Sequence, residues 1–198
     1  MTNNERNPQQ TKRKILRAAL EEFCENGFDG ARVDKIKDEA GVNKRMIYHY
    51  FGSKEGLFEA VFQNQILLLD QILDKAPNNS IREEAKHWME HSDEIKGFLK
   101  LSSWIEFSDL DKLIHEKTDK TNHFKRAVAF FDEMQKDGLF SKEISPDLYL
   151  IGLMALISFP IVLPSLVKFI TDKDPASSEF KTGYFKVVEE MTSHLKKS

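Results

Sequence analysis

The sequence predicts an all-α protein with a three-helix head at the N-terminus, a long connecting helix and a C-terminal helical bundle. Apolar residues recur three and four positions apart along nearly all of the 198 residues, which is the period of a helix with one buried face. No segment shows the apolar–polar alternation of a half-buried strand. Hydrophobic residues make up 40% of the chain and charged residues 31%, as in an ordinary soluble globular protein.

The head is expected to contain three helices separated by glycines. The first begins near Thr11 and stops at Gly27, since glycine adopts the left-handed conformation that ends many helices. Its apolar stripe consists of Ile15, Leu16, Ala19, Leu20 and Phe23. A second, shorter helix ends at Gly41, and Asn43 has the side chain to cap a third helix that begins at Lys44. The inward residues of the second helix are Val33, Ile36 and Ala40.

The rest of the chain is expected to form one long helix and a bundle. Gly52 and Ser53 break the third helix, and Ser53 can cap a fourth over residues 54–75. A Pro-Asn-Asn-Ser linker ends it at residues 77–80. The bundle helices are expected near 81–91, 94–116, 121–137, 146–170 and 177–196. Pro160 should bend the fourth of these, because its ring removes a backbone hydrogen bond and clashes with the preceding turn.

Basic and aromatic side chains gather within eleven positions of the third helix and the turn after it. They are Lys44, Arg45, Tyr48, His49, Tyr50, Phe51 and Lys54. A helix, a glycine turn and a second helix with a basic start form the pattern of a helix-turn-helix, whose second helix enters a DNA groove. Ile47 and Phe51 share a face that can pack inward, which leaves Arg45, Tyr48 and His49 on the opposite side. The alternative is a plain solvated helix face, because charges on one side of a short helix are common.

The net charge of −3 hides an asymmetry between the two ends of the chain. Residues 1–54 hold eleven Lys and Arg against eight Asp and Glu, a balance of +3. Residues 55–198 hold eighteen against twenty-four, a balance of −6. The N-terminal part is therefore expected to face a polyanion, and the longer acidic remainder is not.

Residues 11–58 contain, in order, ILRAALEEFCENGF, VDKI, EAGVNK, IYHYF and GSKEGLF. This series resembles the DNA-binding head of TetR-family bacterial transcriptional regulators. The resemblance implies a homodimer that binds a palindromic operator in double-stranded DNA and, most often, represses until a small-molecule effector binds its C-terminal part. It also implies a helix-turn-helix DNA-binding domain at 1–53, a connector helix at 54–76, and a ligand-binding and dimerisation domain at 77–198.

The resemblance also implies roles for individual residues. Lys44 and Arg45 would enter the major groove, and Tyr48, His49 and Lys54 would contact backbone phosphates, while Tyr50 either joins them or packs inward. The full set of expected DNA contacts is Thr11, Lys12, Arg13, Arg32, Asn43, Lys44, Arg45, Tyr48, His49, Tyr50 and Lys54.

The chain departs from the family pattern at several of these positions. Ala31 stands where a Thr that caps the second helix is usual, and Asn43 replaces a common Ser. Arg32, Lys37 and Arg45 add positive charge, which favours retained DNA binding. Arg45 can also change which bases are read.

The region after residue 80 is rich in aromatic residues, which suggests an apolar ligand pocket between helices. The expected lining is Trp88, Phe98, Leu101, Trp104, Ile105, Phe107, His123, Phe124, Val128 and Phe131. For any single aromatic residue the ordinary place in a packed core is favoured. The composition favours a flat or greasy compound, neutral or cationic.

Residues 148–170 are apolar on nearly all sides, which suits a central helix or a subunit interface. With the last helix they would form a four-helix bundle across a two-fold axis. The expected interface residues are Leu150, Leu153, Met154, Ile157, Ile161, Tyr184, Val188 and Met191.

Other functions have less support in the sequence. His87 and His91 have metal-ligand spacing, but Trp88 lies where a metalloprotease has its glutamate, so neither a metal nor a cofactor is expected. No nucleophile–base pair or phosphate loop indicates an enzyme, and the rival hypotheses are an all-α enzyme and a protein-binding adaptor. Prolines and polar breaks in residues 148–170 argue against a membrane span. The single cysteine, Cys24, is consistent with a reducing, cytoplasmic location.

Overall fold

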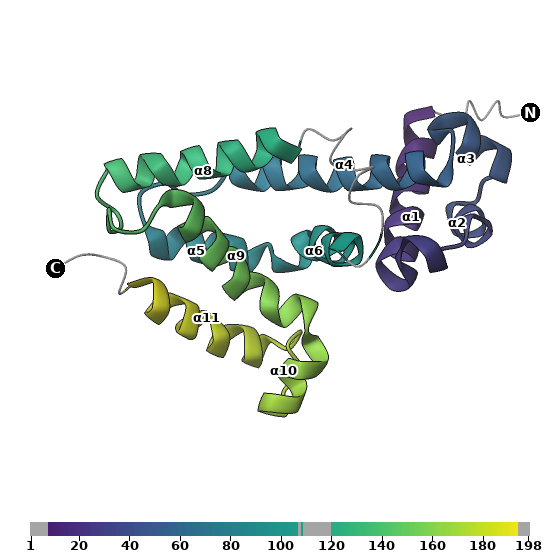
Figure 1. The fold of residues 1–198 in the computed structure, drawn as a ribbon. Coiled ribbons are helices and arrows are strands. Elements are labelled where there is room, and N and C mark those ends of the chain that lie inside the picture. The colour runs from purple at the N-terminus through teal and green to yellow at the C-terminus, as the bar shows by residue number, and fades with distance from the viewer. Residues whose placement is uncertain (1–7, 107, 109–119, 194–198) are drawn as a thin grey trace, which may run out of the picture. The chain divides into compact units, whose positions relative to one another are not determined.

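The computed structural model describes residues 8–106, 108 and 120–193. Every regular element within these ranges is an α-helix, which confirms the predicted fold class (Figure 1). The chain divides into two compact units. Unit 1 comprises residues 1–67 with 100–118, and unit 2 comprises residues 68–99 with 119–198.

Unit 1 contains the predicted three-helix head. Its helices are α1 (Pro8–Gly30), α2 (Val33–Ala40), α3 (Lys44–Phe51) and the first part of α4 (Lys54–Leu73). Helix α1 begins three residues before the predicted start, because Pro8 suits the first helical position, where its missing N–H is not needed. The expected break at Gly27 is confirmed, since this residue has a left-handed φ of 66° and one further turn follows it.

Phenylalanine rings join α1 to α4 in the core of the head. The ring of Phe58 meets the ring of Phe23 edge-on with centroids 5.0 Å apart, and the ring of Phe28 at 5.5 Å. Ile36 from α2 and Ile47 from α3 are fully buried in the same unit. This packing of apolar side chains fixes α2 and α3 on α1 and leaves their polar faces outside.

A close backbone approach explains the glycine in the GSKEGLF motif. A Cβ on Gly56 would lie 2.1 Å from the backbone oxygen of Phe51, so only glycine lets α4 start this close to the end of α3. The Ser53 hydroxyl accepts a hydrogen bond from the Gly56 N–H at 3.1 Å, which confirms Ser53 as the cap of α4.

Unit 2 is a helical bundle. Its complete helices are α5 (Ile81–Glu90), α8 (Lys120–Lys136), α9 (Pro146–Val162), α10 (Pro164–Thr171) and α11 (Ser178–Ser193). Helix α6 (Ser92–Glu106) contributes its first part, and most of the rest of the predicted helix 94–116 lies outside the described residues. Helix α5 packs on α11, and α8 packs on α9.

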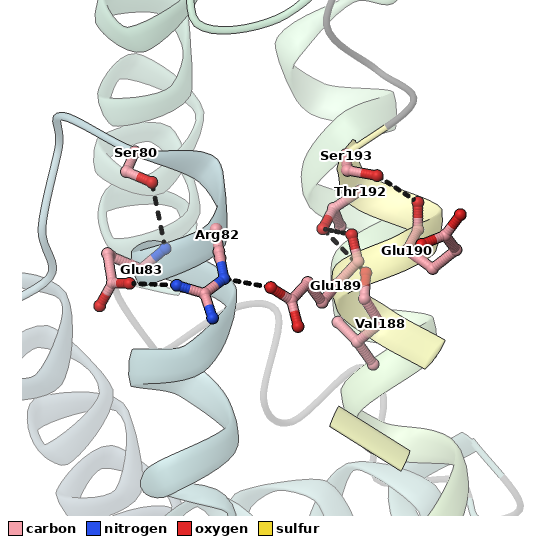
Figure 2. Close-up of polar contacts among 8 residues, drawn as sticks. All are labelled: Ser80, Arg82, Glu83, Val188, Glu189, Glu190, Thr192 and Ser193. Atoms are coloured by element: carbon pink, nitrogen blue, oxygen red, sulfur yellow. Dashed lines mark hydrogen bonds and ion pairs between the residues drawn. The ribbon is translucent and has the colours of Figure 1, made fainter. Parts of the chain in front are cut away.

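Polar contacts tie α5 to α11 (Figure 2). The Ser80 hydroxyl accepts a hydrogen bond from the Glu83 N–H, which caps α5. The Arg82 guanidinium reaches across to the Glu189 carboxylate on α11 and also pairs with Glu83. Lys181 of α11 forms a further ion pair with Asp93, at the start of α6, at 2.7 Å.

The prediction of one helix over 146–170 with a bend at Pro160 is wrong. Helix α9 continues through Pro160 to Val162, and the chain turns by 83° between α9 and α10. The break is at Leu163 (φ −119°, ψ 51°), because the ring of Pro164 disfavours a helical conformation in the residue before it. Within the described ranges, no single helix is long and apolar enough to cross a membrane, while the bent pair α9 and α10 passes on length and composition.

Candidate nucleic-acid interface

Two local features set the angle between α2 and α3. Gly41 ends α2 in the left-handed conformation (φ 64°, ψ 39°), and its N–H donates to the backbone oxygen of Asp38. The Asn43 side chain accepts a hydrogen bond from the Met46 N–H at 2.8 Å and so caps α3. Both predicted boundaries are confirmed, and together they form a helix-turn-helix with α3 as its second helix.

Helix α3 has one inward and one outward face. Ile47 is fully buried, and Phe51 is partly buried beside it. The side chains of Arg45, Tyr48 and His49 are exposed. The predicted division of the helix into two faces is therefore present in the structure, and the outward face carries side chains of the types that bind phosphates and base edges in protein–DNA complexes.

Lys44 and Arg45 are both exposed but differ in their partners. The Lys44 ammonium forms an ion pair with the Asp34 carboxylate of α2, at 3.0 Å. The hydrogen bond to Asp34 raises the pKa of Lys44 and lowers the pKa of Asp34, so both groups are charged at neutral pH. Arg45 has no ion pair with any described residue, which leaves its guanidinium available to a ligand.

Lys12 and Lys54 are partly buried and bind within the head. The Lys54 ammonium lies 4.8 Å above the Phe28 ring and 3.4 Å from the backbone oxygen of Asp29. The Lys12 ammonium lies 5.3 Å above the Tyr50 ring, so Tyr50 is partly buried beneath a cation. Both lysines stabilise the head, and Lys12 places positive charge near the C-terminal end of α3.

The remaining expected DNA contacts lie at the start of α1, before α2 and before α3. Thr11 is partly buried, and Arg13, Arg32 and Asn43 are exposed. Arg32 precedes α2 and gives it no side-chain cap.

The cap of α2 comes instead from Glu22 of α1, a residue that sequence reasoning missed. Its carboxylate accepts the Arg32 N–H at 3.0 Å and pairs with the Lys35 ammonium at 2.9 Å, while the buried Ala31 offers no cap. Burial raises the pKa of Glu22, but the hydrogen bonds from Lys35 and Arg32 outweigh it and lower the pKa below its usual value. The sequence did contain one sign of this contact. Glu22 comes seven residues, about two helical turns, after Ile15 and so lies on the same side of the helix as the apolar stripe.

Unit 2 contains an apolar cavity of about 60 Å³. Its walls are Leu69, Trp88, Ile95, Phe98, Leu99, His123, Phe124, Ala127, Leu150, Leu153, Met154, Ile157 and Ser158. Four of the expected pocket residues, Trp88, Phe98, His123 and Phe124, lie in these walls. The Nδ1 atom of His123 is 2.9 Å from the Asp70 carboxylate of α4, which itself binds Arg126 at 2.5 Å.

The other expected pocket residues lie elsewhere. Leu101 and Ile105 are buried in unit 1, and Phe107 is outside the described residues. Trp104 also belongs to unit 1, where its ring covers Gly27 and its N–H donates to the Cys24 backbone oxygen at 3.4 Å. Val128 and Phe131 are absent from the walls, and the Phe131 ring packs on Tyr149 instead. Helical spacing showed which residues share a face but not which unit the face joins.

Most residues expected at a dimer interface face inward. Leu150, Leu153, Met154 and Ile157 line the cavity, and Val188 is fully buried. Ile161 and Tyr184 are partly buried, and the Tyr184 hydroxyl donates to the Leu156 backbone oxygen at 2.8 Å. Met191 is the one exposed member of the set, at 54%. Since α9 is apolar on all sides, its sequence could not show which face turns inward.

The two histidines at metal-ligand spacing bind backbone groups. His87 Nε2 is 2.9 Å from the Ile72 backbone oxygen, and His91 Nδ1 is 2.8 Å from the His87 backbone oxygen. In the part of the chain that the structure describes, no group of three His, Cys, Asp or Glu side chains is placed to hold a metal ion.

The family described as "Bacterial regulatory proteins, tetR family" matches residues 15–61 of this chain. The HTH-type transcriptional repressor SCO4008 of Streptomyces coelicolor is 30% identical over 177 residues, which cover 88% of this chain and 90% of that protein. The HTH-type transcriptional repressor NicS of Pseudomonas putida is 42% identical over 79 residues, or 37% of each chain.

Solved structures share the fold. Salmonella enterica GusR superposes with a TM-score of 0.71 at 20% identity and covers 99% of this chain and 100% of its own. HlyIIR, a hemolysin II transcriptional regulator, superposes with a TM-score of 0.61 at 24% identity over 96% of this chain and 99% of its own. The family match and the likeness to SCO4008 show that the chain belongs to the tetR family of bacterial regulatory proteins, DNA-binding regulators of transcription with an N-terminal helix-turn-helix.

Proposed function

We propose that the protein is a cytoplasmic repressor that binds a palindromic operator in double-stranded DNA as a homodimer and is released by a small molecule. The observation that carries this proposal is the exposed face of α3, with Arg45, Tyr48 and His49 turned outward by the Gly41 turn and the Asn43 cap. Residues 1–53 would bind DNA, residues 54–76 would connect, and residues 77–198 would bind ligand and dimerise.

The two residues at the start of α3 have different tasks in this proposal. Arg45 is free to form the paired hydrogen bonds to guanine O6 and N7 that arginine makes in the major groove. Lys44 must exchange its ion pair with Asp34 for a contact with DNA, so Asp34 opposes binding until that exchange occurs.

Phosphate contacts would come from groups around α3. Tyr48 and His49 on α3, with Lys12, Arg13 and Arg32 nearby in the head, supply donors for backbone oxygens. Thr11, Asn43, Tyr50 and Lys54 complete the proposed set. Each phosphate neutralised releases condensed counterions, so binding should weaken steeply as salt rises.

The proposed dimer surface is the exposed apolar part of α9, α10 and α11. Its members are Leu148, Ile151, Phe159, Val162, Leu163, Leu166, Phe169, Ile170, Val187 and Met191. Phe169 is 89% exposed, and a large apolar side chain this exposed within an apolar patch is typical of a protein–protein contact surface. A two-fold contact would bury the same residues on both copies and present two identical helix-turn-helix units to two half-sites.

Helix α4 is the proposed route from ligand to DNA. It is continuous from Lys54, at the helix-turn-helix, to Leu73, and Asp70 on it holds the cavity residue His123. A ligand in the cavity can release DNA only if it binds one arrangement of α4 more tightly than the other. Ligand contact with His123 is a direct way to bias α4.

Selection of DNA from a random duplex pool tests the proposal. The wild-type protein should enrich a palindrome, and Lys44→Ala should weaken binding to it by about tenfold, as expected for the loss of a groove contact from both subunits. Lys142→Ala, an exposed lysine of unit 2, is the matched control and should bind like wild type. Failure to enrich any site, or equal binding by both variants, would contradict the proposal.

A further inference from the structure

Two polar side chains are buried in unit 2 without partners. Glu84 of α5 is wholly buried, and Tyr149 of α9 is 4% exposed. Neither oxygen of the Glu84 carboxyl group, nor the Tyr149 hydroxyl, makes a hydrogen bond to any described residue. Buried polar atoms are nearly always hydrogen-bonded, because leaving them unpaired destabilises the folded state. These atoms therefore indicate a missing partner.

Glu84 and Tyr149 lie close enough to interact electrostatically, and residues next to them on α5 and α9 line the apolar cavity. Trp88, one helical turn after Glu84, lines that cavity, as do Leu150, next to Tyr149, and Leu153, one turn further. The Tyr149 ring is packed between aromatic rings, with the Phe131 centroid at 5.0 Å and the Phe140 centroid at 4.5 Å. Glu84 and Tyr149 do not line the cavity themselves, but Trp88 and Leu150, which are close to them along the chain, do.

None of the described residues forms an ion pair with Glu84. The nearby Arg82 is instead paired with Glu83 and with Glu189 of α11 (Figure 2). Burial raises the pKa of Glu84 to about 8, and the neighbouring Trp88 side chain opposes this rise. At pH 7 the Glu84 carboxyl group is therefore mostly protonated and uncharged.

The chemistry of the missing partner follows from the two groups. An ionised carboxylate only accepts hydrogen bonds, and a phenol both accepts and donates. A group that satisfies both must carry several N–H donors, and a positive charge would offset the cost of ionising buried Glu84. The surrounding rings of Trp88 and Tyr149 also favour a cation over an anion.

We propose that Glu84 and Tyr149 bind the charged end of a small amidinium or primary ammonium ligand whose apolar body fills the cavity. The Trp88 side chain moves aside to join the cavity to the pair, and the carboxyl proton passes to solvent as the cation binds. This inference rests on the proposed function, because the ligand would be the effector of the repressor.

Benzamidine and benzamide form a matched pair of probes for the full-length protein, since they have nearly the same shape and only benzamidine is charged. By isothermal titration calorimetry at pH 7, benzamidine should bind wild type at least tenfold more tightly than benzamide. Glu84→Gln should reduce benzamidine binding to the level of benzamide, and Tyr149→Phe should weaken it severalfold. Glu83→Gln, a change of the partly buried neighbour, should leave it unchanged.

Proton release distinguishes a cation on Glu84 from any other binding. With a pKa of about 8, Glu84 should release about 0.9 protons per benzamidine at pH 7, visible as a binding enthalpy that differs between phosphate and Tris buffers. Histidine side chains ordinarily titrate near neutral pH, and His87 lies three residues after Glu84 on the same helix. The proton release of Glu84 is therefore read as the difference between wild type and Glu84→Gln, in which the contribution of His87 cancels.

Each outcome has a defined meaning. Equal affinities for the two probes, or equal proton release by wild type and Glu84→Gln, would overturn the inference and assign water to the buried pair. If Glu84→Gln does not fold, the Tyr149→Phe affinity and the wild-type proton release decide. Operator binding is measured beside these titrations. If wild type binds no operator even without benzamidine, the proposed function alone is contradicted. If benzamidine binds but does not release the operator, the effector role is overturned.

Discussion

Glu84 gives the structure a stability that should depend on pH in an unusual direction. In the unfolded chain this carboxyl group titrates at its ordinary pKa of 4.5, and burial raises the pKa to about 8 in the folded protein. The folded state therefore holds the proton more tightly. Stability is fully present below pH 4.5 and falls as the pH rises toward 8, because only the unfolded state gains from ionisation in that range.

The size of the effect follows from the shift in pKa. A difference of about 3.5 units corresponds to roughly 5 kcal/mol over the whole range, at about 1.4 kcal/mol per unit. Glu84→Gln keeps the shape but cannot ionise, so its stability relative to wild type should increase by about 3 kcal/mol between pH 5 and pH 8.

Chemical denaturation measured by circular dichroism gives this difference. Both proteins are unfolded in urea at pH 5, 6, 7 and 8, at one protein concentration so that subunit association affects them equally. The titration of other groups cancels in the comparison. Parallel stability curves for the two proteins would refute the reasoning, since they would mean that Glu84 is ionised or hydrated in the folded state.

Three further substitutions test the head and the proposed dimer surface. Asp34→Asn should raise operator affinity severalfold by releasing Lys44 and removing a negative charge near the phosphates, as measured by fluorescence anisotropy; unchanged affinity would exclude a competing role for the ion pair. Gly56→Ala should destabilise the head by roughly 2–4 kcal/mol, because its Cβ would lie 2.1 Å from a carbonyl oxygen. The control Gly183→Ala, in open space on α11, should be neutral or stabilising. Similar melting temperatures for the two variants would contradict this contrast. Phe169→Ser should shift the protein toward monomer in analytical ultracentrifugation without loss of helicity, and an unchanged dimer would remove this residue from the interface.

Local signals in the sequence were enough to predict the head. The left-handed Gly41 and the Asn43 cap depend on residues within one turn of themselves, so both boundaries could be placed from the sequence alone. The charged face of α3 followed from the position of Ile47 on the opposite side.

Features that depend on tertiary packing could not be predicted in this way. Helix α9 is apolar all round, so its sequence did not reveal that Leu153 and Met154 line a cavity while Ile151 is exposed. Both Pro160 and Pro164 could interrupt a helix in this region, and the structure shows that the break is at Leu163, the residue before Pro164. Charge normally indicates exposure, so nothing in the sequence marked Glu84 as buried.

The most direct test of the central claim is the affinity of wild type and Arg45→Ala for the selected duplex and for its single-base variants, measured by anisotropy at fixed salt. If α3 reads the major groove, the loss of Arg45 from both subunits should weaken binding by tenfold or more and abolish the preference at one base pair in each half-site, because each paired contact to guanine is worth about 1–3 kcal/mol. An Arg45→Ala protein with the affinity and base preferences of wild type would contradict the assignment of α3 as the recognition helix.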